Sequence, residues 1–165
     1  EHFTLALNLD EDDPYTLSQY GKLLVDLKRP EEAVKHLKKA ISIMPDYSFA
    51  YYNIAKAYQD LRDFPNAIYN LMFSLNYEPD DVYAVNVLGR MFLEVGLNDR
   101  ALRTFEEIIS EYDPNDKYAY LGKAEALYAM KRYSDAEVVI DKLKVMAKKD
   151  DRILKKISEL IEKYS

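Results

Sequence analysis

Apolar and small side chains recur along this chain at steps of 34 or 35 residues. One column of small residues contains Gly21, Ala55, Gly89 and Ala124, and a second contains Ala33, Ala67, Ala101 and Ala136. Large apolar residues keep the same steps in further columns, such as Leu17, Tyr51, Val85 and Tyr120. Self-similarity at a fixed period of this length is the signature of a repeat protein. The pattern therefore predicts four repeats, at residues 14–47, 48–81, 82–116 and 117–150.

Each repeat is expected to contain two helices, because its apolar residues lie three or four positions apart. In the first repeat, one such face contains Leu17, Tyr20, Gly21, Leu24 and Leu27. A second face contains Ala33, Leu37, Ala40, Ile41 and Met44. Proline interrupts a helix, so Pro45 and Pro79 are expected to end the second helices of their repeats. Glycine inside a helix costs up to about 1 kcal/mol relative to alanine, so Gly21 and Gly89 predict places where paired helices approach closely.

These columns resemble the tetratricopeptide-repeat family, whose unit is a helix–turn–helix of 34 residues. The resemblance implies an all-α fold, an α-solenoid of such repeats that forms a right-handed superhelix, and a protein-binding function. Two repeats depart from the family pattern. In residues 82–116, Pro114 comes one residue late and Ile108 replaces a small residue. In residues 117–150, Lys123 stands where a large apolar residue is expected, and no proline closes the repeat.

The two ends of the chain extend the periodic pattern. Residues 1–9 match the second helix of a preceding repeat, so residues 1–13 predict a truncated repeat with further chain upstream. Residues 151–165 predict a C-terminal capping helix that begins at Asp150 or Asp151. Its polar side, which terminal repeats need, contains Lys155, Lys156, Glu159, Glu162 and Lys163.

The composition and motifs of the chain limit the classes of function that we expect. The 165 residues carry a net charge of −6 and include no cysteine, which excludes disulfides and thiol chemistry. The chain has no glycine-rich phosphate loop, nucleophile elbow or His-Glu-x-x-His motif, so we expect a protein without catalytic activity, cofactor or metal. His36 is expected to be a solvated surface residue. The acidic balance argues against nucleic acid as a partner, and no apolar stretch is long enough to span a membrane.

The first helices of stacked pairs are expected to line a concave face. Their residues outside the packing columns form an aromatic row and a basic row, the latter interrupted at Glu125. Exposed aromatic residues beside Arg or Lys are typical of binding hot spots. The candidate peptide-binding groove therefore contains Tyr15, Lys22, Phe49, Tyr52, Asn53, Lys56, Tyr83, Asn86, Arg90 and Tyr118.

A structural explanation of these rows stays open. Acidic residues four positions on, at 26, 60 and 94, can neutralise Lys22, Lys56 and Arg90, and the aromatic row can pack on neighbouring helices. Both rows would then be inherited through repeat duplication. Of the residues with which some tetratricopeptide domains grip a C-terminal carboxylate, only Asn53 matches here.

The leading hypothesis is a protein–protein interaction scaffold that binds a protein or peptide ligand in this groove. One alternative is self-association, in which the basic end at residues 142–165 meets the acidic end at residues 1–13 head to tail. A further alternative is a regulatory segment of a larger enzyme.

Overall fold

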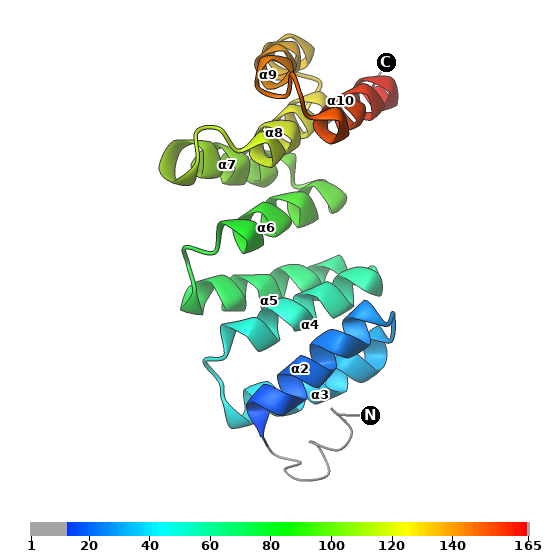
Figure 1. Cartoon of the computed structure of the whole chain (residues 1–165), viewed down its shortest axis with the longest axis vertical. Helices are drawn as coiled ribbons and strands as arrows, with labels where there is room; N and C mark the ends of the chain where they lie inside the picture. The colour runs from blue at the N-terminus through cyan, green and yellow to red at the C-terminus, as the bar shows by residue number, and fades with distance from the viewer. Residues whose placement is uncertain (1–12, 165) are drawn as a thin grey trace. The chain divides into compact units, whose positions relative to one another are not determined.

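The computed structural model describes residues 13–164, and every regular element in that range is helical. These residues form nine α-helices, drawn in Figure 1. Their bounds are α2 (Pro14–Asp26), α3 (Pro30–Ile43), α4 (Ser48–Asp60), α5 (Phe64–Tyr77), α6 (Val82–Glu94), α7 (Asn98–Glu107), α8 (Lys117–Ala129), α9 (Tyr133–Met146) and α10 (Asp151–Tyr164). The predicted all-α fold of packed helix pairs is confirmed, whereas the helix expected at residues 1–9 lies outside the described residues.

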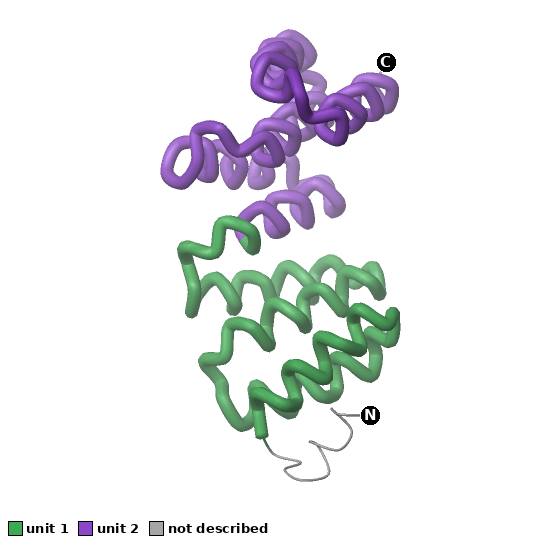
Figure 2. Tube along the Cα trace, in the orientation of Figure 1, with its two compact units in different colours: residues 1–84 green, residues 85–165 purple. Residues whose placement is uncertain are grey.

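The chain divides into two compact units, residues 1–84 and 85–165 (Figure 2). In the first unit, α2 packs on α3 and α4, α3 packs on α4, and α4 packs on α5. In the second unit, α8 packs on α7, α9 and α10, and α10 also contacts α9. We describe each unit by itself.

Most first helices of the pairs begin at an aspartate that caps the helix. The carboxylate accepts a hydrogen bond from the amide three residues on, over 2.7 to 3.3 Å, at Asp13, Asp81, Asp116 and Asp150. An N-cap of this kind contributes about 1 kcal/mol. In the second repeat Tyr47 takes this place, and α4 begins without a side-chain cap.

The turns inside the helix pairs reverse the chain through one residue with a left-handed backbone. In the third repeat this residue is Gly96, at a φ of 75°. The other repeats place longer side chains there, at φ of 58° to 60°, namely Lys28, Arg62 and Lys131. The following amide then donates to a carbonyl five residues back, as from Arg132 N to Leu127 O over 2.9 Å. This closure is a Schellman motif, whose left-handed position glycine fits best.

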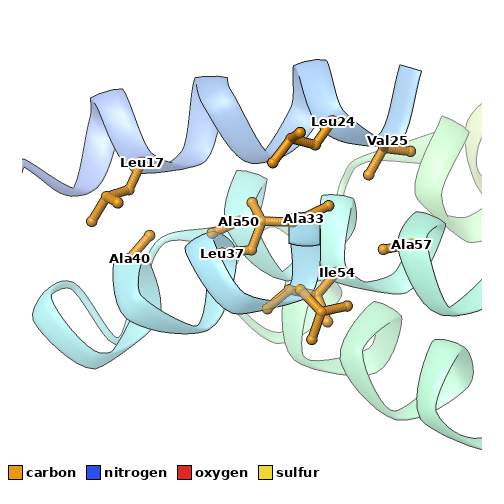
Figure 3. Close-up of a cluster of buried hydrophobic side chains, with 10 residues drawn as sticks. Leu17, Leu24, Val25, Ala33, Leu37, Ala40, Ala50, Ile54 and Ala57 are labelled. Atoms are coloured by element: carbon orange, nitrogen blue, oxygen red, sulfur yellow. The ribbon is translucent and has the colours of Figure 1, made fainter. Parts of the chain in front are cut away.

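The core of the first unit combines leucine and isoleucine with alanine (Figure 3). Leu17, Leu24, Leu37 and Ile54 are each at most 1% exposed. A Cβ atom added at Gly21 would overlap the side chain of Leu37 on the paired helix α3. The close approach predicted from the glycine at position 21 is therefore present.

In the second unit, one phenylalanine ring packs against two glycines. The fully buried ring of Phe105 on α7 points at Gly89 on α6 and at Gly122 on α8. A Cβ atom at Gly89 would lie 2.8 Å from two ring carbons of Phe105, and one at Gly122 would overlap the ring tip. Both glycines are therefore required by packing, although the sequence columns identified only Gly89.

The third repeat accommodates its extra residue in a π-helical turn. Residues Ile108–Tyr112 form this turn directly after α7, and the amide of Asp113 donates to the carbonyl of Ile108 over 2.9 Å. A π-turn contains one residue more than an α-turn, which explains why Pro114 comes late. Ile108 is fully buried, so a large residue fits where the first two repeats have Ala40 and Ser74.

We predict that Gly122→Ala lowers the free energy of unfolding by about 1–3 kcal/mol, because the added methyl group overpacks the Phe105 ring. This loss exceeds the gain of up to about 1 kcal/mol in helix propensity. Chemical denaturation of Gly122→Ala, Phe105→Leu and the double variant measures the coupling. We expect the methyl group to cost less in the chain that already carries Phe105→Leu; strictly additive effects would contradict the packing explanation.

A second prediction concerns the left-handed turn residues. Lys131→Gly should raise the free energy of unfolding by about 0.5–1 kcal/mol, because glycine adopts this backbone without the steric penalty of a Cβ atom. Gly96→Ala should lower it by about 1 kcal/mol, since nothing lies within 4 Å of the added Cβ and only the backbone changes. Equal midpoints for Lys131→Gly and the parent chain would show that the turn is unstrained.

Candidate functional site

Among residues 13–164 there is neither a metal-binding cluster nor a membrane-spanning helix. No group of three His, Asp or Glu side chains is placed to hold a metal ion between residues 13 and 164. The helices of that range are also too short or too polar to cross a membrane. His36, expected to be solvated, is instead half-buried, with its ring edge-on to Tyr20 at a centroid distance of 4.9 Å. Burial lowers the pKa of this imidazole.

Five aromatic side chains of the first unit, which we call the aromatic ladder, form two contacting groups: Tyr15, Tyr47 and Phe49 in one, and Tyr52 and Tyr83 in the other. Tyr47 joins two helices, since its ring centroid lies 5.3 Å from Tyr15 and 5.7 Å from Phe49. One turn further along α4, Tyr52 contacts Tyr83 at 6.1 Å. The predicted residues at 15 and 49 thus belong to one group and those at 52 and 83 to the other, and Tyr47 is a member that the sequence columns did not identify.

The end residues of the aromatic ladder are exposed to solvent, whereas Tyr52 is partly covered. The side chains of Tyr15 and Tyr83 are 57% and 68% exposed, whereas Tyr52 is half-buried. Burial raises the pKa of the Tyr52 hydroxyl far above its usual value, with smaller contributions from Tyr83 and Asp81. Tyr52 is therefore a neutral supporting residue, and Tyr83 lies over it with most of its own ring in solvent.

The basic residues beside the ladder differ in their pairing. Lys22 pairs with Asp26 at 2.9 Å, as the structural explanation expected, and this hydrogen bond is the main reason why the pKa of Asp26 is lowered. Asp60 pairs with Lys28 of the preceding repeat at 3.0 Å and not with Lys56. Within the described residues, Lys56 has no carboxylate partner and lies 6.0 Å from the ring of Tyr52.

Asn53 departs from its predicted place in the groove. Its side chain is only 2% exposed and donates to the carbonyl of Phe49 over 2.7 Å. Ser18 on α2 is likewise fully buried. Asn53 therefore contributes packing and not ligand contact.

The second unit contains the remaining predicted residues and a hollow of about 280 Å³. Arg90 is exposed and lines this hollow, Asn86 is half-buried, and Tyr118 is 49% exposed. The floor of the hollow includes Leu121 and Leu160. Its charged lining residues are Arg90, Glu125, Lys156, Glu159 and Lys163.

Helix α10 supplies part of this lining, which the sequence analysis did not foresee. Lys156 and Lys163 were expected on the polar outer side of a capping helix, yet both line the hollow. Lys163 bonds to Glu125 of α8 over 2.9 Å, and Lys156 lies 5.2 Å from the ring of Tyr118. The sequence did hold a signal, because Lys156 and Leu160 are four residues apart and share one side of the helix.

Known proteins agree with this architecture. Residues 21–61 match a family model described as TPR repeat, and residues 92–160 match one described as tetratricopeptide repeat. Tetratricopeptide repeat protein 13 of Homo sapiens is 29% identical over 120 residues, which are 72% of this chain and 14% of that protein. Protein CTR9 homolog of Arabidopsis thaliana is 24% identical over 100 residues, or 61% of this chain and 9% of that protein. The chain therefore spans a small part of the length of these relatives.

Solved structures show the same fold. PilW, a type IV pilus biogenesis factor, has a TM-score of 0.84 at 21% identity, over 93% of this chain and 71% of that one. MamA has a TM-score of 0.82 at 23% identity, over 91% and 87%. YrrB, described as a TPR protein with an unusual peptide-binding site, has a TM-score of 0.76 at 18% identity, over 97% and 92%. From its matched repeat models, its helix pairs and these structural neighbours, this chain belongs to the tetratricopeptide-repeat family.

Proposed function

We propose that this chain is a non-catalytic interaction module that binds a protein or peptide segment on the face formed by its first helices. The observation that carries this proposal is the aromatic ladder, whose end residues Tyr15 and Tyr83 hold most of their rings in solvent. Large apolar side chains left exposed in a cluster mark interaction sites. Burying one such ring against a ligand is worth about 1.5–3 kcal/mol.

Tyr47 supports the proposal because it stands where an aspartate would cap helix α4. The corresponding residue in the neighbouring repeats is Asp13 or Asp81, and both cap a helix. Tyrosine cannot cap in this way, so α4 forgoes roughly 0.5–2 kcal/mol. In return the ring joins Tyr15 on α2 to Phe49 on α4, so an aromatic contact replaces a standard stabilising one.

Lys56 gives this surface a preference for acidic ligands. Its ammonium group has no carboxylate partner in the described part of the chain, whereas Lys22 and Lys28 are neutralised by aspartates. A cation that forms no ion pair with a carboxylate can attract the carboxylates of a ligand and steer their approach. The whole chain carries a net charge of −6, so this local positive charge matters for an acidic partner.

Two further observations bear on the alternatives. The similar fold of YrrB is described as carrying a peptide-binding site, which supports the same use of the fold here. The head-to-tail association of residues 142–165 with residues 1–13 involves a segment of which only Asp13 is described. It stays a prediction, and sedimentation at several concentrations distinguishes it from a monomeric binder.

The first test of this function uses several peptides selected independently from a displayed library against the whole chain. We predict that Tyr83→Ala weakens their binding at least about tenfold, as expected of an aromatic hot spot, without lowering the denaturation midpoint. The matched control is Tyr69→Ala, which removes a ring that is 58% exposed on the second helix α5. Equal binding by Tyr83→Ala and the parent chain for every peptide would contradict the proposal.

The second test separates binding from stability at position 47. We predict that Tyr47→Asp and Tyr47→Ala both weaken peptide binding, since each interrupts the aromatic ladder. Tyr47→Asp should nevertheless be about 0.5–2 kcal/mol more stable than Tyr47→Ala, because aspartate restores the missing N-cap. Calorimetric titration and denaturation of both variants measure the two effects. Full binding by Tyr47→Asp would show that Tyr47 plays no part in recognition.

A further inference from the structure

Helix α10 completes a hollow in the second unit whose cations are only partly neutralised. Lys163 is paired with Glu125 at 2.9 Å, and Glu159 lies 3.8 Å from Lys155. Arg90 and Lys156 have no carboxylate partner among residues 13–164. The hollow therefore presents two cations that a bound anionic group can satisfy.

The lining residues and the volume of the hollow also indicate what kind of group it can bind. Leu121 and Leu160 are 5% and 6% exposed and form an apolar floor. A volume of about 280 Å³ lies just below the roughly 300–1,000 Å³ of sites that enclose drug-sized ligands. The hollow is thus suited to one or two side chains of a peptide and not to a cofactor.

We propose that this hollow binds the side-chain carboxylate of an internal acidic residue in a peptide ligand, held by Arg90 and Lys156, with a neighbouring aliphatic side chain on Leu121 and Leu160. The inference rests on the proposed function and names the chemistry of its ligand. A side-chain carboxylate is favoured over a C-terminal one because the hollow is lined by arginine, lysine, glutamate and leucine. It offers no amide side chain to bind the main-chain groups of a peptide end.

Glu125 regulates the strength of this site. Its side chain is 18% exposed and holds the ammonium group of Lys163, and this hydrogen bond raises the pKa of Lys163. Glu125 also interrupts the basic row of the first helices, so it places a negative charge beside Arg90 in the hollow. Replacing it with glutamine removes this competing carboxylate and keeps the shape of the residue.

The experiment is a titration of the whole chain, followed by the amide signals in NMR spectra. The probe is an acetylated and amidated peptide with the central sequence Leu-Glu-Glu-Leu between Gly-Ser flanks. Its counterpart carries Leu-Gln-Gln-Leu, and a third peptide has Leu-Gln-Gln-Leu with a free C-terminal carboxylate. We expect only the first peptide to shift the signals of residues 90, 121, 156 and 160.

Variants test the named contacts. Arg90→Gln and Lys156→Gln should each raise the dissociation constant of the acidic peptide about three- to fivefold, which is the effect expected of one exposed charge contact. Glu125→Gln should lower this dissociation constant by a similar factor. The matched control is Lys148→Gln, which makes the same charge change just before α10 at an exposed residue that does not line the hollow. We expect it to bind as the parent chain does.

Equal shifts with the acidic peptide and its glutamine counterpart would overturn the inference. So would shifts at the hollow with the free C-terminus alone, or equal weakening by Lys148→Gln and Lys156→Gln. Signals of α2 and α4 distinguish the two proposals. If peptides shift these signals and leave the hollow unchanged, the proposed function stands and the inference fails; if no peptide shifts either set, both fail.

Discussion

The structure depends on how closely neighbouring helices can approach. Gly21 receives Leu37, and Gly89 and Gly122 receive the ring of Phe105. At these points one helix presents no side chain and the other fills the space, as the dense packing of protein interiors requires. Because the paired helices are fixed in this way, the remaining side of each first helix is left to carry aromatic and charged residues.

The sequence predicted the part of the fold that follows from periodicity. The spacing of small and large apolar residues located the helix pairs, and the mid-helix glycines indicated the close contacts. Predictions failed where a side chain's direction depends on its neighbours in space. Asn53 is buried although its column lay next to the aromatic row, and Asp60 pairs with Lys28 of another repeat instead of Lys56. Helix α10 lines a hollow because its packing on α8 turns Lys156 and Lys163 toward Glu125 and Arg90.

Deviations from the repeat pattern gave more information about function than the pattern itself. Tyr47 replaces a capping aspartate and joins Tyr15 to Phe49. Glu125 replaces a basic residue and binds Lys163. The extra residue of the third repeat, in contrast, has a structural explanation, since a π-turn absorbs it. A departure is therefore informative about binding when it costs stability and leaves a group available to a ligand.

The central claim is that ligands contact the first helices and not the second. Photo-cross-linking tests it most directly, with a benzophenone side chain placed either at position 83 or at position 69 and a peptide selected against the unmodified chain. Both positions are strongly exposed, so both report contact without disturbing a core. We expect a cross-link from position 83 and none from position 69. Cross-linking from position 69 alone would contradict the claim.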